Sequence, residues 1–283
     1  MSEKFILVCT TQDLSPKFDR FITSLINQSY RDFIVYFALQ DIDIHEFEAR
    51  YSEINFQVRL FSIKKAGLSS ARNFLLQQIK VNFNNINYTL SFPDDDCWYA
   101  PDLLLEVDNI LSKRNFDFLF LNVYDPIASS YYGNRPNVTR ILSSLELLHI
   151  PISVGIFIRN NISDINEFNE YFGVGTDFGS GEETIFLLDN GVLNKNHIYM
   201  GKISIFHEID KDDTYLKMFQ YAFGYGVMLK HLVLMQHISA FLVFVLFAKF
   251  FVRNGVNIYK PRRFLFNFRR LVNIYRGYNE YSF

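Results

Sequence analysis

The first 125 residues alternate short apolar runs with segments of helical period, and this alternation limits the possible folds more than any other feature. Strands that alternate with helices predict crossover connections and a mostly parallel sheet flanked by helices. We therefore predict an α/β domain. The expected strands are residues 5–10, 33–37, 56–61, 88–92 and 116–123, and the expected crossover helices carry Phe18, Phe21, Ile22, Leu25 and Ile26, and then Ala71, Phe74, Leu75 and Ile79.

Three consecutive carboxylates, Asp94, Asp95 and Asp96, follow the expected strand at residues 88–92. In an open sheet of this kind, ligands bind beyond the carboxyl ends of the strands. Two like charges about 4 Å apart repel by roughly 4 kcal/mol at an effective dielectric of about 20, so the cluster favours a bound cation. Mg²⁺ or Mn²⁺ suits such oxygen ligands. The alternative is a solvated acidic turn that caps a helix beginning near Pro101.

A basic turn at residues 64–73 contains Lys65, Gly67 and Arg72 and opens an amphipathic helix. Unpaired N–H groups at a helix start, together with nearby cations, favour an anion such as a diphosphate. The alternative is an ordinary strand-to-helix turn with charges on its surface.

The segment after residue 150 is less regular, with an expected strand at residues 152–158 and a glycine-rich loop at residues 173–181. The loop leads into a short expected helix that begins with Glu182 and Glu183. A flexible loop followed by paired carboxylates is suited to supply a general base. The alternative is that the acids only stabilise the positive end of the helix dipole. His207 follows another expected strand and is either a metal ligand or a structural histidine.

The charge of the chain is unevenly distributed. Residues 230–283 contain nine Lys or Arg and one acid, Glu280, whereas the rest of the chain is acidic by about ten charges. Residues 232–248 are nearly all apolar and lie at the lower length limit for a spanning helix. We expect this segment and the basic cluster Arg262, Arg263, Arg269 and Arg270 to bind an anionic membrane surface rather than nucleic acid. The alternative is a buried helix with a solvated basic face.

Only two cysteines are present, Cys9 and Cys97, and neither lies in a Cys-x-x-Cys pair, so reduced cytosolic thiols are expected. The apolar run at residues 5–9 is too short for the core of a signal peptide. We therefore expect a cytoplasmic protein that associates peripherally with the inner face of the cell membrane.

The order of these motifs resembles that of the family-2 glycosyltransferases with the A-type fold, particularly the bacterial members that build capsule and lipopolysaccharide O-antigen chains. The likeness covers about residues 4–232. It depends on four segments: residues 9–11 (Cys-Thr-Thr), 67–73 (Gly-Leu-Ser-Ser-Ala-Arg-Asn), 92–96 (Phe-Pro-Asp-Asp-Asp), and 168–170 (Phe-Asn-Glu) followed by 181–183 (Gly-Glu-Glu).

The resemblance implies roles for several of these residues. Asp94 would lie near the ribose of a nucleotide and Asp96 on a Mn²⁺ or Mg²⁺ ion that bridges the two phosphates, with His207 near the metal. Glu183 looks like the catalytic base, and Glu182 would hold the loop or orient the acceptor. The remaining donor-binding candidates are Thr10, Asp41, Lys65, Arg72 and Asp95.

Two positions depart from the family pattern. The family usually has Asp where this chain has Glu183, and Glu is longer by one methylene group. The family also usually has an acidic pair after the second strand, where residues 38–41 read Ala-Leu-Gln-Asp. Thr10 and Asp41 are the best candidates for nucleobase recognition.

The activity that the resemblance implies is inverting transfer of a sugar from a nucleotide-sugar donor to a saccharide or lipid-linked acceptor, and the family likeness favours a UDP-linked donor. The alternatives are a nucleotidyltransferase and a catalytically inactive, transferase-like scaffold. The expected domains are residues 1–229, with a nucleotide-binding half at about 1–125 and an acceptor-facing half at about 126–229, and a helical extension at residues 230–283.

Overall fold

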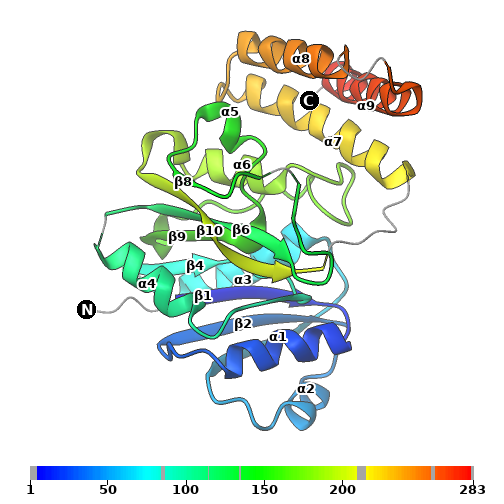
Figure 1. Cartoon of the computed structure of the whole chain (residues 1–283). Helices are drawn as coiled ribbons and strands as arrows, with labels where there is room; N and C mark the ends of the chain where they lie inside the picture. Colours follow the sequence, from blue (N-terminus) through cyan, green and yellow to red (C-terminus); the bar gives the residue numbers. More distant parts are fainter. Residues whose placement is uncertain are drawn as a thin grey trace. The chain divides into compact units, whose positions relative to one another are not determined.

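The computed structural model describes residues 5–83, 87–113, 115–133, 135–208, 215–255 and 259–281 (Figure 1). The chain forms two compact units. The first comprises Met1–Phe168 with Asp189–Ile209, and the second comprises Asn169–Leu188 with Asp210–Phe283. The predicted division at residue 229 falls within a helix of the second unit, and as a division by function it remains a prediction.

The first unit is built on one mixed sheet, with strand order β3-β2-β1-β4-β9-β6-β10-β5; β7 pairs with β6, and β8 pairs with β10. Neighbouring strands from β3 to β4 are parallel, and β6 is parallel to β10. The strands are β1 (Phe5–Thr11), β2 (Phe33–Gln40), β3 (Gln57–Ile63), β4 (Asn87–Ser91), β5 (Cys97–Trp98), β6 (Phe118–Asp125), β7 (Ser130–Tyr131), β8 (Thr139–Arg140), β9 (Ile156–Asn161) and β10 (His197–His207).

Strand β9 separates the two parallel parts of the sheet, because it runs antiparallel to both β4 and β6. Strand β9 also begins later than the strand predicted at residues 152–158. Ser153–Gly155 form a 3-10 turn, and β9 begins at Ile156. Gly155 passes very close to β6, where an added Cβ would lie 2.7 Å from the backbone oxygen of Leu121. Two reversals of direction leave β6 and β10 running the same way as β1 and β4.

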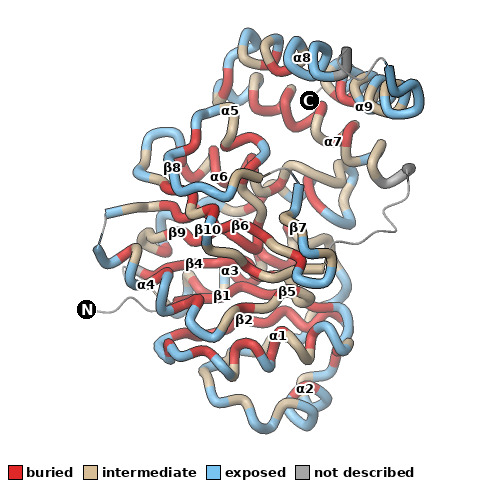
Figure 2. Tube along the Cα trace, in the orientation of Figure 1, coloured by how far each residue is buried: buried red, intermediate tan, exposed pale blue. Residues whose placement is uncertain are grey.

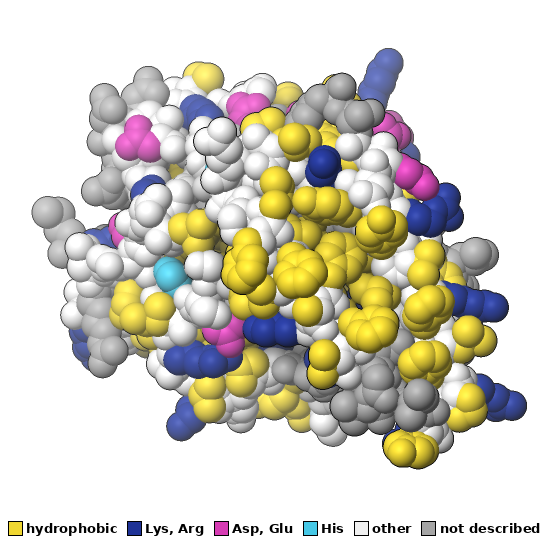
Figure 3. Space-filling model, turned by 90° about the horizontal axis from the view of Figure 1, so that it is seen from above, with side chains coloured by type: hydrophobic (Ala, Val, Ile, Leu, Met, Phe, Trp, Pro, Cys, Tyr) yellow, Lys and Arg dark blue, Asp and Glu magenta, His cyan; other side chains and the backbone are white. Residues whose placement is uncertain are grey.

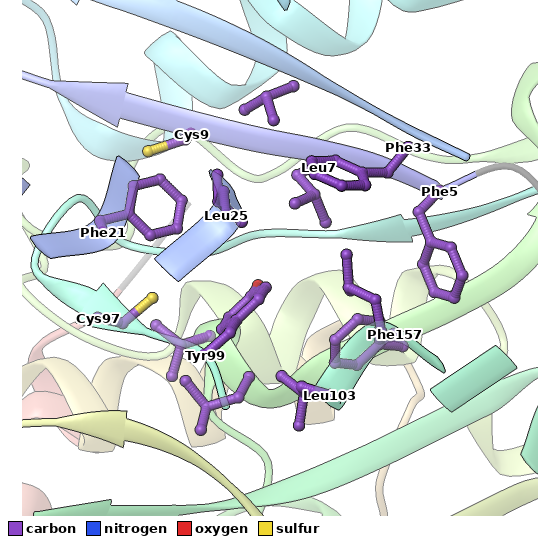
Figure 4. Close-up of a cluster of buried hydrophobic side chains, with 14 of the residues drawn as sticks. Phe5, Leu7, Cys9, Phe21, Leu25, Phe33, Cys97, Tyr99, Leu103 and Phe157 are labelled. Atoms are coloured by element: carbon purple, nitrogen blue, oxygen red, sulfur yellow. The ribbon is translucent and has the colours of Figure 1, made fainter. Parts of the chain in front are cut away.

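Helices cover both faces of this sheet, as the predicted α/β class requires. The helices are α1 (Pro16–Ile26), α2 (Ile44–Arg50), α3 (Leu68–Asn82), α4 (Leu103–Lys113) and α5 (Ser144–Leu147). Every residue of β1 is buried, which is typical of a central parallel strand (Figure 2). One core cluster joins Phe5, Leu7 and Cys9 of β1 to α1 and α4 (Figure 4). The buried residues of α3 are absent from that cluster, and α3 contacts β1 and β2.

Helix α1 shows why the sequence period predicted these elements correctly. Its buried side chains include Phe18, Phe21, Ile22 and Leu25, which recur at helical spacing. Ser15 caps its start by accepting a hydrogen bond from the backbone N–H of Phe18, and proline occupies the first turn.

The second unit contains α6 (Glu182–Asp189), α7 (Tyr215–Leu234), α8 (Ala240–Gly255) and α9 (Pro261–Glu280). The apolar segment at residues 232–248 is not one helix, because α7 ends at Leu234 and α8 begins only at Ala240. Gln236, between them, has a left-handed φ of 61°. Among the helices of the described ranges, none has both the length and the apolar character needed to cross a membrane.

Helices α7 and α9 approach each other closely at two glycines. A Cβ on Gly226 of α7 would lie 2.0 Å from the backbone oxygen of Ile274, and a Cβ on Gly277 of α9 would lie 2.1 Å from that of Phe223. Only glycine permits such an approach at both positions. The pair of glycines therefore fixes where the two helices cross.

Candidate active site

The carboxyl ends of β1, β2, β3, β4 and β10 lie at one edge of the sheet, because these strands run in the same direction. Thr10 lies near the end of β1, Asp41 follows β2, Lys65 follows β3, and Asp94 follows β4. His207 ends β10. The predicted donor and metal residues of the first unit therefore share the edge of the sheet at which open α/β folds bind their ligands.

Asp94, Asp96 and His207 come together at this edge. One ligand atom from each lies within 4.8 Å of the others, and all three residues are half-buried. The antiparallel pairing of β5 with β10 sets Cys97 opposite His207, which places the preceding Asp96 beside the imidazole. His207 Nε2 lies 3.0 Å from Asp96 Oδ1. Two carboxylates and one imidazole form a donor set that fits a divalent cation, with water or phosphate oxygens completing its coordination.

The charges of this group are partly compensated by cations of the same unit. Lys17 Nζ lies 3.7 Å from Asp96 Oδ2, and Arg72 pairs with Asp94. Burial raises the pKa of Asp96, but the hydrogen bond and charge of His207 and the charge of Lys17 outweigh it, so that this pKa is lowered. Burial lowers the pKa of His207, but the hydrogen bond and charge of Asp96 outweigh it, so that this pKa is raised. The two groups stabilise each other as an ion pair.

Asp95 has a different environment from its neighbours. Burial raises the pKa of Asp95 to about 6, a hydrogen bond with Thr11 opposes the rise, and the charges of Asp96 and Asp94 add to it. Asp96 therefore ionises more readily than Asp95.

Arg72 lies beneath the acidic cluster rather than on the surface. Its side chain is 1% exposed, and Nη2 donates a hydrogen bond of 2.9 Å to Asp94 Oδ1. The guanidinium lies near the rings of Phe92 and Phe168, at 5.8 and 5.4 Å from their centroids. Arg72 therefore orients the first carboxylate, whereas its predicted role beside the diphosphate remains a prediction.

The next residue, Asn73, fixes a second motif. Its side-chain amide donates to the backbone oxygen of Phe168 at 2.9 Å and accepts from the backbone N–H of Phe168 at 2.7 Å. This two-point contact links the predicted motifs at residues 67–73 and 168–170 within the first unit. The sequence showed both motifs but not the contact between them.

A side-chain contact holds the loop after β3 against the last residue of β2. The backbone N–H of Ala66 donates to Gln40 Oε1 at 2.8 Å, which holds the basic turn against the end of β2. Asp41 is exposed and adopts a left-handed φ of 56°, and Lys65 is also exposed. Thr10 is buried. Their roles in donor binding remain predictions.

Four residues beside the acidic cluster were missed by the sequence analysis: Lys17 and Arg20 of α1, Trp98 of β5, and Glu208. The guanidinium carbon of Arg20 lies 3.6 Å from the centroid of the Trp98 ring, and Arg20 Nη1 donates to Glu208 Oε1 at 2.7 Å. Lys17 Nζ lies 3.9 Å from Glu208 Oε2. The available signals were the position of Trp98 two residues after Asp96, and the spacing of Lys17 and Arg20 on one face of a helix whose other face is apolar.

Glu182 and Glu183 belong to the second unit and begin α6. Glu182 is 5% exposed, whereas Glu183 is half-buried. Gly181, just before them, has a φ of +101°, and a Cβ there would lie 2.8 Å from Met228 Cγ. The preceding Ser180 donates a hydrogen bond of 3.0 Å to the backbone oxygen of Tyr221. The end of the loop is thus packed against α7, and the catalytic roles of both acids remain predictions.

No family model matches this chain, and a search of curated proteins found no match. Solved structures match its fold. TarS 1-349 of S. aureus is 14% identical, with a TM-score of 0.54 over 98% of this chain and 91% of that one. Mannosyltransferase PcManGT from Pyrobaculum calidifontis, in complex with GDP-Man and Mn²⁺, is 10% identical, with a TM-score of 0.62 over 99% of this chain and 88% of that one.

A longer TarS chain from S. aureus matches with a TM-score of 0.55, and this chain covers 43% of its length. TarS 1-349 in complex with UDP-GlcNAc matches with a TM-score of 0.51, over 81% of this chain and 71% of that one. At 10–14% identity these likenesses show the fold alone. The mixed sheet flanked by helices therefore fits a fold like the glycosyltransferase A type, which the family resemblance implied.

Proposed function

We propose that this chain is an inverting glycosyltransferase that moves a sugar from a nucleotide-sugar donor to a saccharide or lipid-linked acceptor. The observation that carries the proposal is the group Asp94, Asp96 and His207 at the carboxyl edge of the sheet, in a fold matched by a mannosyltransferase in complex with GDP-Man and Mn²⁺. A group of this kind suits a donor that carries a diphosphate.

In this proposal Asp96 and His207 would hold a Mn²⁺ or Mg²⁺ ion, and Asp94 would bind the donor near its ribose. The bound cation would stabilise the negative charge of the departing diphosphate. Arg72 keeps Asp94 in place from below. Lys17 lies 3.7 Å from Asp96 and is a further cation available to the phosphates. Thr10, Asp41, Lys65 and Asp95 are assigned to the nucleotide.

The catalytic base is assigned to Glu183. It would accept the proton of an acceptor hydroxyl while that oxygen attacks the anomeric carbon from the face opposite the diphosphate, which inverts the configuration there. The burial of Glu182 supports a structural role for that residue, and the partial exposure of Glu183 supports access to a substrate.

For the donor we propose a UDP-sugar, since TarS 1-349 is described in complex with UDP-GlcNAc, with a GDP-sugar as the next choice because PcManGT is described with GDP-Man. We assign the reaction to assembly of a surface polysaccharide, such as capsule or O-antigen, at the inner face of a membrane. This assignment depends on the family resemblance and on the basic tail.

The test is a thermal-stability screen of the full chain with UDP-, GDP- and dTDP-sugars, with and without Mn²⁺. A donor that binds the folded state raises the unfolding temperature by mass action, and we expect one nucleotide class to do so only with Mn²⁺. Analysis of the released product separates the alternatives. A glycosyltransferase releases nucleoside diphosphate, a nucleotidyltransferase releases pyrophosphate, and an inactive scaffold releases neither.

A further inference from the structure

The outward side of α8 is apolar, which is the reverse of an ordinary surface helix. Val243 and Leu246 are buried, whereas Phe241, Phe244 and Phe251 are 72%, 67% and 66% exposed. The exposed apolar positions 241, 244, 248 and 251 recur at helical spacing and so form one stripe. Helix α8 thus directs one apolar stripe into its own unit and a second one away from it.

An open hollow of about 410 Å³ lies along this outer stripe, and its lining includes Phe241, Phe244, Ala248 and Val252 together with Lys249 and Arg253. Its walls are aromatic and aliphatic, and its only charged lining is basic. Such a hollow suits an apolar group whose neighbour carries negative charge.

Helix α9 carries a matching stripe. Leu265, Phe268, Val272 and Tyr275 are 50%, 43%, 40% and 60% exposed and recur at helical spacing. The ring of Tyr275 lies 6.3 Å from that of Phe247, so the stripe reaches α8 at this end. Figure 3 shows hydrophobic side chains gathered over this side of the second unit, with Lys and Arg around them.

We call these two stripes and the basic side chains that flank them the α8–α9 face. Its exposed basic members are Lys249, Arg253, Arg262, Arg263, Arg269, Arg270 and Arg276. The single acid of the whole segment 230–283, Glu280, lies 3.1 Å from Arg276 and so compensates one of them. The remaining cations surround an apolar surface without acidic neighbours on α8 or α9.

We propose that the α8–α9 face binds the surface of a membrane that contains anionic lipids. Its aromatic side chains would enter the boundary between headgroups and acyl chains, and its Lys and Arg side chains would contact lipid phosphates. Helices that lie in this plane need an apolar face rather than a spanning length.

A second copy of this chain is the other occupant that an apolar surface suggests. In a two-fold dimer the same patch meets itself, so the arginines of one copy would approach those of the other. Such like-charge contacts oppose association, whereas an anionic surface compensates the same charges. The charge of the face therefore favours the membrane.

The test is flotation of the purified full chain with vesicles of phosphatidylcholine alone and of phosphatidylcholine mixed with phosphatidylglycerol. We expect binding to the mixed vesicles that weakens with added salt, because salt screens the contribution of the basic side chains. Combined Phe241→Ser, Phe244→Ser and Phe251→Ser should lower the partition coefficient by more than about tenfold. Combined Arg262→Glu and Arg269→Glu should lower the partition coefficient on mixed vesicles by more than about fivefold for each arginine that is replaced.

Matched controls come from the first unit. Val81, Ile127 and Ile141 are 76%, 71% and 68% exposed, so their combined change to Ser removes similar apolar exposure elsewhere. Lys113→Glu with Lys202→Glu reverses two exposed charges elsewhere. Both controls should bind vesicles as the unchanged chain does, or nearly so. Thermal unfolding of each variant confirms that it is folded.

The substitution Phe244→Trp tests whether the α8–α9 face contacts lipid. Phe244→Trp should show a blue-shifted emission on mixed vesicles and quenching by brominated lipid, against the background of Trp98 measured in the unchanged chain. The proposal is overturned if the unchanged chain does not float with mixed vesicles, or if the phenylalanine variant floats equally well. It is also overturned if the chain is a dimer without vesicle binding and the phenylalanine variant is a monomer, because the face then joins two copies.

Discussion

Arg72 Nη2 lies 2.9 Å from Asp94 Oδ1, in an ion pair whose guanidinium is 1% exposed and whose carboxylate is 33% exposed. The pair links α3 to the loop after β4, two motifs that the sequence presents 22 residues apart. The first carboxylate of the acidic cluster is thus positioned by a cation from below, and its other side remains accessible.

Loss of the Asp94 carboxylate should therefore cost stability as well as activity. Asp94→Ala leaves a charged guanidinium buried without its partner, which should lower the free energy of unfolding by about 3 kcal/mol, the low end of the range for a broken buried pair. Asp19→Ala removes the acid of the exposed Arg50–Asp19 pair, which also accepts a hydrogen bond from Tyr51, and should cost less than Asp94→Ala because water screens the exposed pair. Urea unfolding of both variants measures the difference, and equal losses would contradict the burial argument.

The His207–Asp96 pair should make stability depend on pH in metal-free buffer. Because the pKa of His207 is raised above its unfolded value of 6.5, the protonated imidazole contributes fully to the free energy of unfolding below pH 6.5. This contribution is lost as pH rises through the folded pKa. Because the pKa of Asp96 is lowered, the ionised carboxylate contributes to the free energy of unfolding above pH 3.8. That contribution is lost as pH falls through the folded pKa, which lies below 3.8. His207→Gln should therefore be most destabilising between about pH 4 and about pH 6.5, and less so at higher pH.

Urea unfolding with a chelator present, repeated across that pH range, measures the difference in the free energy of unfolding between the unchanged chain and His207→Gln. If this difference stays constant or increases above neutral pH, the His207–Asp96 pair does not form as described.

Glu183 and Glu182 should respond differently to neutral replacement. If Glu183 is the base, Glu183→Gln should lower turnover by about 10²- to 10⁴-fold with donor affinity nearly unchanged. Glu182→Gln should reduce turnover less, and Glu183→Asp should retain substantial activity. Steady-state turnover and donor titration distinguish these cases. Normal turnover of Glu183→Gln together with inactive Glu182→Gln would exchange the two roles.

The crossing of α7 and α9 should not tolerate a single added methyl group. Gly226→Ala and Gly277→Ala each place a Cβ about 2 Å from a backbone oxygen of the other helix, and each should lower stability by about 1–3 kcal/mol despite the better helix propensity of alanine. At Gly179 the nearest atom to an added Cβ is a side-chain carbon at 3.4 Å, so Gly179→Ala is the control. Thermal unfolding compares them, and a stabilised Gly226→Ala variant would exclude this packing.

Much of the first unit could be predicted from local pattern. The strands and crossover helices repeat their apolar residues at fixed periods, and Asp94–Asp96 follow a strand whose carboxyl end must lie at the binding edge. The antiparallel position of β9 could not be predicted, because it depends on pairing with β4 and β6, which lie far from it in the sequence.

Two features could not be predicted from local sequence patterns: the contacts around Trp98 and the division of residues 232–248 between two helices. Lys17, Arg20 and Glu208 approach the acidic cluster only through tertiary packing of α1 and β10, so no spacing in the sequence shows their contact with Asp96 or Trp98. The apolar residues 232–248 suggested one helix, but a turn with left-handed Gln236 divides them between two helices, and half of the second helix faces outward.

We propose that the group Asp94, Asp96 and His207 serves transfer from a nucleotide sugar. The most direct measurement is the release of nucleoside diphosphate from UDP- and GDP-sugars by the full chain with Mn²⁺, compared with Asp96→Asn and with the distant carboxylate change Glu106→Gln. We predict release by the unchanged chain and by Glu106→Gln, and a loss of more than about 100-fold in Asp96→Asn, because the site loses a charged metal ligand. Equal release by Asp96→Asn, or release by none of the three with any donor, would show that this group does not serve nucleotide-sugar transfer.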